Sequence, residues 1–201
     1  MRRLVLQYLR TERKPSQGSV LGAQKMPGQE IDLRPVTHIM ADAIGPPGSR
    51  VFYIQGWEGD RTITLIVEKI QVQSLAIGVE QFLDEISEKF TGLPEASPDY
   101  VEDRMHIHPP VDPLFRVGEI GLGYDPDNDM VVLIAKELVS EEENPEEADV
   151  VRFWCTRSQL RAMTHWGVEV ASRGRPTCPQ CGEPMDPEGH FCPKKNGHQG
   201  E

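Results

Sequence analysis

The sequence predicts an α+β fold in which two strand-strand-strand-helix halves form a mostly antiparallel sheet with packed helices. Three observations predict this fold. Short apolar runs at strand spacing come in two groups of three, and a stretch of helical periodicity follows each group. Three of the four cysteines then fall in the last 24 residues, which sets the C-terminal segment apart. Hairpins that each end in a helix are typical of helices packed on a largely antiparallel sheet.

The first group of strands begins after residue 31. We expect three strands, over 36–44, 51–55 and 62–67. Glycine and proline at 45–48 predict a turn, because proline fixes φ and glycine accepts a positive φ. Residues 58–60 predict a hairpin turn before the third strand, in which apolar residues alternate onto one face.

A helix is expected after these strands. Seven apolar residues recur at helical spacing and form one broad stripe: Val72, Leu75, Ala76, Val79, Leu83, Ile86 and Phe90. Residues 91–113 then contain five prolines, which exclude a regular element. We therefore interpret this stretch as a Pro-rich linker between the two halves, or a long crossing loop.

The second half repeats this order. We expect strands over 115–124, 130–138 and 150–155, followed by a helix over about 158–172. Strand 130–138 is apolar on both faces, so we place it inside the sheet. Residues 125–129 predict a turn and residues 140–149 an acidic loop.

These elements predict three parts. Residues 1–30 form an N-terminal extension that we expect to be partly disordered, residues 31–173 form the α+β domain, and residues 174–201 form a cysteine-bearing tail. The halves 31–91 and 114–173 share one order of elements, which suggests an internal duplication. A coincidence of hairpins followed by a helix is the alternative.

The distribution of charge bears on partners. The formal net charge is −11, and residues 31–172 carry eleven Lys and Arg against twenty-six Asp and Glu. An acidic body repels a phosphate backbone, so we expect no binding of duplex nucleic acid. No apolar run approaches the roughly 18 residues that a membrane span needs. Four cysteines are too few for a disulfide-dense secreted scaffold, and we expect a cytoplasmic protein.

The C-terminal cysteines have metal-ligand spacing. Cys178 and Cys181 flank two residues and precede Gly182, and this tight turn lets both sulfurs point at one ion. His190 and Cys192 follow, so the spacing permits a tetrahedral Cys₃His zinc site. Four protein ligands leave no open position, which predicts a structural zinc knuckle. His198 competes with His190 as the fourth ligand.

Two alternatives to the zinc knuckle exist. The first is a redox pair of Cys178 and Cys181, and the second is a set of thiols without metal. A thioredoxin-like pair follows a strand at the start of a helix, whereas this pair follows a predicted helix and a proline. The redox interpretation is therefore disfavoured.

Weaker patterns have structural interpretations. His106 and His108, with Glu102 and Asp103 upstream, suggest a hydrolase-type metal pair, but spacing places no third ligand and a polar loop is favoured. Acidic residues at 125, 127 and 129 suggest the opening of a calcium loop, but the later ligand positions are absent and a hairpin turn is favoured. Cys155 with His165 suggests a nucleophile and base, but Cys155 lies in a predicted strand as a small apolar residue.

Several sequence motifs, taken together, resemble those of a known protein family. They are Leu33-Arg34-Pro35-Val36-Thr37-His38-Ile39, Gly45-Pro46-Pro47-Gly48, Arg50-Val51-Phe52-Tyr53-Ile54-Gln55, Phe115-Arg116-Val117-Gly118, and the closing Gly174-Arg175-Pro176-x-Cys178-Pro179-x-Cys181-Gly182 and Asp186-Pro187-Glu188-Gly189-His190-x-Cys192-Pro193. Over about residues 31–198 the chain resembles the uncharacterised, mainly actinobacterial domain-of-unknown-function 3090 family. It departs from the family in residues 1–30 and in its long acidic loop.

The resemblance implies a Cys-Cys-His-Cys tail on Cys178, Cys181, His190 and Cys192. In the family the position of His198 is also occupied by tyrosine, which favours His190 as ligand. The family's genes tend to lie beside genes for a histidine-phosphatase-like and a lipid-kinase-like protein, which implies a partner of one of these kinds. The resemblance supplies no activity.

Two functions are compatible with these observations. The first is a non-enzymatic binding or adaptor protein with a structural zinc site, favoured because the sequence shows no convincing catalytic set. The alternative is an enzyme that acts on a small phosphorylated metabolite, with His38, His106 and His108 as candidate groups.

Overall fold

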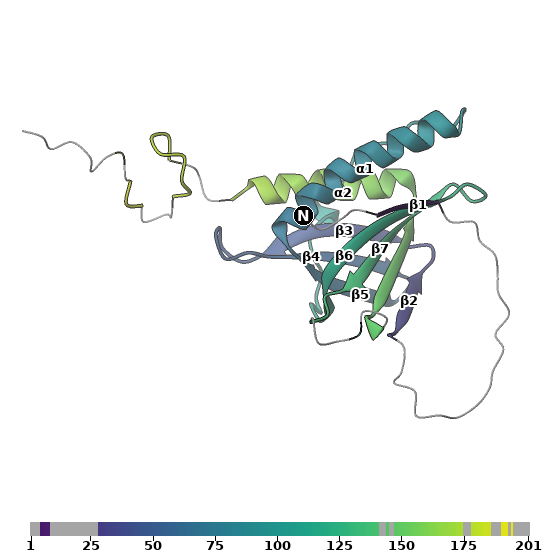
Figure 1. Cartoon of the computed structure of the whole chain (residues 1–201), viewed down its shortest axis with the longest axis horizontal. Coiled ribbons are helices and arrows are strands. Elements are labelled where there is room, and N and C mark those ends of the chain that lie inside the picture. The colour runs from purple at the N-terminus through teal and green to yellow at the C-terminus, as the bar shows by residue number, and fades with distance from the viewer. Residues whose placement is uncertain are drawn as a thin grey trace, which may run out of the picture.

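A computed structural model describes residues 5–8, 28–140, 144, 147–174, 178–185, 190–192 and 194. The strands are β1 Val5–Tyr8, β2 Glu30–Leu33, β3 His38–Ile44, β4 Val51–Glu58, β5 Arg61–Val67, β6 Pro113–Asp125, β7 Met130–Glu137 and β8 Val150–Cys155, and the helices are α1 Lys69–Lys89 and α2 Arg157–Ser172. Figure 1 shows both helices together along one side of the sheet. No helix in the described part of the chain is long and apolar enough to cross a membrane.

The predicted α+β fold with two strand-strand-strand-helix halves is confirmed. Strands β3, β4 and β5 form an antiparallel meander before α1, and β6, β7 and β8 form a second one before α2. The sheet order is β2-β8-β7-β6-β5-β4-β3, so the apolar strand β7 is flanked on both sides as expected. The parallel pairs β5–β6 and β2–β8 lie where one half meets the other.

The two edge strands of this sheet, β2 and β3, are consecutive in the chain, and a short connection of residues 34–37 joins them. The Val36 N–H donates to the Trp154 carbonyl at 2.8 Å, and the Thr37 N–H donates to the Trp57 carbonyl at 2.7 Å. The short connection 34–37 thus bonds to β8 and then to β4. Arg34 within it bonds to the buried Asp125 at 2.6 Å and lies over the Trp154 ring.

The sequence analysis missed strand β2. The strand that it predicted over 36–44 is β3, which begins two residues later, at His38. Strand β2 has only four residues, of which Ile31 and Leu33 are buried while Glu30 and Asp32 are exposed. It pairs in parallel with β8, and such distant pairing leaves no signal in the local sequence. The expected disorder of 1–30 falls mostly outside the described residues, although Val5–Tyr8 pairs in parallel with β6. Half of the acidic loop, residues 141–143, 145 and 146, also lies outside them.

Local signals explain where α2 begins. The Thr156 hydroxyl accepts a hydrogen bond from the Gln159 N–H at 3.1 Å, and the Gln159 side chain accepts one from the Thr156 N–H at 2.9 Å. This reciprocal pair satisfies two backbone donors at the start of the helix. Gly167 then lets α2 approach α1 and β3, because a Cβ there would lie 2.9 Å from a Val72 methyl and 3.2 Å from the Ala41 Cβ.

The core requires a second close approach, at Gly56 of β4. A Cβ at this position would lie 2.6 Å from the ring of Phe153, which is fully buried on β8. We expect Gly56→Ala to lower the free energy of unfolding by about 1–3 kcal/mol, the usual cost of overpacking a core. Urea denaturation followed by circular dichroism measures this loss.

Phe153→Val provides the control for this prediction. In the Phe153→Val background the δ and ε carbons that a Cβ at Gly56 would meet are absent, so Gly56→Ala should cost clearly less than it does in the native background. An equal cost in both backgrounds would contradict the contact between Gly56 and Phe153.

Candidate metal centre

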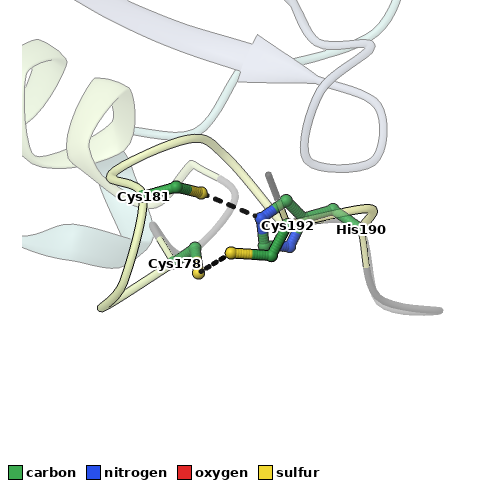
Figure 2. Close-up of side chains that lie close together, drawn as sticks. All are labelled: Cys178, Cys181, His190 and Cys192. Carbon is green, nitrogen blue, oxygen red and sulfur yellow. Dashed lines mark hydrogen bonds between the residues drawn. The ribbon is translucent and has the colours of Figure 1, made fainter. Parts of the chain in front are cut away.

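The four predicted metal ligands converge. The sulfurs of Cys178, Cys181 and Cys192 and a ring nitrogen of His190 all lie within 4.8 Å of one another. Figure 2 shows the four side chains turned toward a common centre. The sulfurs of Cys178 and Cys192 lie 3.9 Å apart, and Cys181 Sγ lies 3.1 Å from His190 Nε2. Two sulfurs that share a tetrahedral zinc ion at 2.3 Å lie about 3.8 Å apart. The cluster therefore has dimensions that suit a metal ion.

A tight turn positions the first two sulfurs. The Gly182 N–H donates to the Cys178 carbonyl at 2.8 Å, and the Cys178 N–H donates to the Glu183 carbonyl at 2.8 Å. Gly182 has a φ of 81°, in the left-handed region that favours glycine. The Cys-x-x-Cys-Gly pattern thus forms the turn that its spacing predicts.

Backbone groups favour the metal-binding form of Cys178. The N–H groups of Cys181 and then Gln180 point at its sulfur and lower the pKa of the Cys178 thiol to about 7. The thiolate is the form that binds metal. By contrast, full burial raises the pKa of the Cys155 thiol to about 12, so this cysteine is a small core residue and is unsuited to act as a nucleophile.

Burial also suits a closed site. Cys178 and Cys192 are 7% and 5% exposed, and Cys181 and His190 are half-buried. Among the residues that the structure describes, this is the one group of His, Cys, Asp and Glu side chains placed to share a metal ion. The competing ligand His198 lies outside the described residues.

Two of the three histidines proposed for the enzymatic alternative, His38 and His108, lie against the same Trp57 ring. His38 Nε2 lies 2.6 Å from the Arg104 carbonyl oxygen, and burial lowers the pKa of His38. His38 lines a cleft of about 400 Å³, whose lining includes neither His106 nor His108. The ring of His106 lies 3.3 Å from the Asp42 carboxylate. The enzymatic function stays a prediction.

Two other patterns have the structural roles favoured above. The Asp125 carboxylate accepts hydrogen bonds from the Asp127 N–H and the Asn128 side chain, as expected of a hairpin turn. His165 on α2 bonds to Glu80 on α1 at 3.1 Å, while Cys155 is buried in β8.

The sequence analysis missed two buried polar residues that fasten the Pro-rich stretch to the sheet. Gln55 exchanges two hydrogen bonds of 3.0 Å with the backbone of His108, and the Asp42 carboxylate accepts the Ile107 N–H at 3.0 Å. Burying these groups is costly without partners, so residues 106–108 are held against β3 and β4. The available signal was a polar residue at a core position of each predicted strand.

Comparisons with known proteins agree with the sequence motifs. A family model described as "Protein of unknown function (DUF3090)" matches residues 31–192. The matched region contains all four clustered residues and ends at Cys192. No curated protein and no solved structure matches the chain.

The geometry predicts which histidine matters for metal binding. His190→Ala should weaken zinc affinity by at least about 100-fold, because it removes one of the four side chains that converge on the metal position. His198→Ala is the matched control and should leave affinity unchanged. Competition titration with a chromogenic chelator measures both variants. Loss of affinity in His198→Ala with retention in His190→Ala would contradict the assignment.

Proposed function

The chain belongs to the DUF3090 family, and from its geometry we propose that it is a binding or adaptor protein in which a structural zinc ion organises the C-terminal segment. The observation that carries this proposal is the convergence of three sulfurs and one imidazole from residues 178–192. The family description names no activity, so the proposal rests on the chemistry of this cluster.

The donor set favours zinc. Three thiolates and one imidazole are soft to borderline ligands, which suit Zn²⁺ better than Mg²⁺ or Ca²⁺. Zinc accepts a tetrahedron without a geometric preference of its own. Four protein ligands fill that tetrahedron, so no position is left for a water or a substrate, and the ion supplies stability to the fold.

The segment around the cluster needs such a contribution, because its described residues, 178–185 and 190–192, bury few apolar side chains. Phe191 is 77% exposed and Met185 is only partly buried, so hydrophobic packing does little to order this described part. Metal binding to a site that forms only on folding supplies folding free energy directly.

The zinc-ordered segment also offers a contact surface. Phe191 directly precedes the ligand Cys192, so the metal fixes the position of a large exposed aromatic side chain. Exposed aromatic residues on a rigid loop are frequent hot spots of protein interfaces. We infer that Phe191 contacts a protein partner, and the net charge of −11 favours a partner with a basic surface. A histidine-phosphatase-like or kinase-like protein is the candidate that the family resemblance supplies.

Metal content tests the structural role. We expect one equivalent of zinc in protein purified without chelator, and none in Cys178→Ser, because one missing thiolate opens the tetrahedron. Limited proteolysis should then cut Cys178→Ser between residue 174 and the C-terminus while the α+β body resists. Plasma mass spectrometry and intact-mass analysis of the fragments measure the two effects.

Cys155→Ala is the matched cysteine control and should keep its zinc, since Cys155 lies in the core away from the cluster. Native protein with clearly less than one equivalent of zinc, or a Cys178→Ser variant with native metal content and native cleavage, would contradict the structural role.

Phe191→Ala tests the contact surface. This variant should retain one equivalent of zinc, because the side chain is no ligand, yet lose the partner that the native protein captures from lysate of the source cells. Ile77→Ala on α1, where Ile77 is 64% exposed, controls for general loss of apolar surface. Quantitative mass spectrometry compares the three captures. Identical captures from the native protein and from Phe191→Ala would refute a role for Phe191.

A further inference from the structure

A cleft of about 570 Å³ lies apart from the metal cluster, between the β3–β4 turn, the start of α1 and the end of α2. Its lining includes three cations: Arg50 before β4, Lys69 at the start of α1 and Arg116 on β6. Small-molecule sites typically enclose about 300–1,000 Å³. The cleft therefore has the size of a ligand site.

The charge of this cleft is opposite to that of the protein. One acidic residue, Glu68, lines it, and this carboxylate pairs with Arg116. Lys69 forms no ion pair with any residue in the described part of the chain. Arg50 donates a hydrogen bond to the Val170 carbonyl at 3.2 Å, and no carboxylate among the described residues pairs with it. Two positive charges are thus left uncompensated in a chain whose net charge is −11.

We propose that this cleft binds a small phosphorylated molecule. A phosphate monoester carries a charge of about −1.5 to −2 at neutral pH, which the two uncompensated cations match. Guanidinium and ammonium groups are the usual donors to phosphate oxygens. A carboxylate would leave one of the two charges unmatched.

The rest of the cleft suits an organic group. Val51 and Pro184 line it beside the cations, and Val51 is 38% exposed, so its surface is available to a ligand. The volume exceeds what a phosphate group fills. The ligand would direct its phosphate at Arg50 and Lys69 and rest its organic part on Val51 and Pro184.

This site goes beyond the proposed adaptor function and stands apart from the metal. All three cations belong to the α+β body, and only Pro184 comes from the cysteine segment. The cations that would bind the phosphate therefore do not depend on the metal, whereas the apolar contact with Pro184 does, so binding is tested on the zinc-loaded protein.

Phenyl phosphate is a suitable probe, because it joins a phosphate monoester to an apolar ring. Titration into the full-length, zinc-loaded protein, followed by two-dimensional ¹H–¹⁵N NMR, should give saturable shifts that cluster around Arg50, Lys69 and Arg116. Benzoate, with one carboxylate on the same ring, should bind clearly more weakly.

Lys69→Gln should weaken phenyl phosphate binding by about tenfold, because it removes a charged donor to the phosphate. Lys89→Gln, at the other end of the same helix, is the matched control and should change affinity less than twofold. Both lysines are exposed, so neither change disturbs the core.

Four results would overturn the proposal: no saturable shifts, shifts spread over surface cations generally, equal affinity of Lys69→Gln and Lys89→Gln, or equal binding of benzoate. A phosphate on a lipid headgroup carries the same chemistry. If the protein co-sediments with phosphatidic acid vesicles but does not bind phenyl phosphate, the proposal of a soluble ligand is wrong.

Discussion

The convergence of three thiol sulfurs and one imidazole is the interaction on which the C-terminal segment, and the role we assign to it, depends. The one large aromatic side chain of this segment, Phe191, faces solvent and contributes little packing to its described residues. Its geometry is encoded locally. Gly182 permits the tight turn, and the amides of Gln180 and Cys181 stabilise the Cys178 thiolate. In the role that we propose, a bound metal ion would convert these weak local preferences into a fixed loop.

The α+β body supplies the platform to which this loop is attached. Residues 34–37, which join the two edge strands of its sheet, bond first to β8 and then to β4, and Arg34 links this connection to the buried Asp125. Gly56 of β4 lies against Phe153 of β8 across the core. Arg50 and Arg116, which line the proposed ligand cleft, belong to this same body.

The features that the sequence predicted are those with short-range signals. Alternation and helical periodicity identified both meanders and both helices, and the Cys-x-x-Cys-Gly spacing identified the metal cluster. Features that depend on distant contacts were missed. Strand β2 pairs with a strand 120 positions later, and Gln55 is buried because it bonds to the backbone of His108. The cations of the cleft come from the β3–β4 turn, from α1 and from β6, and no local pattern marks them as neighbours.

X-ray absorption spectroscopy at the zinc edge tests the central claim most directly, because it reports the atoms bound to the ion. A closed Cys₃His site predicts three sulfur neighbours at about 2.3 Å and one nitrogen at about 2.0–2.1 Å, with no further light ligand. A shell rich in oxygen, or one with a water in place of a protein ligand, would contradict it. The ion would then have an open position, and a purely structural role would no longer follow.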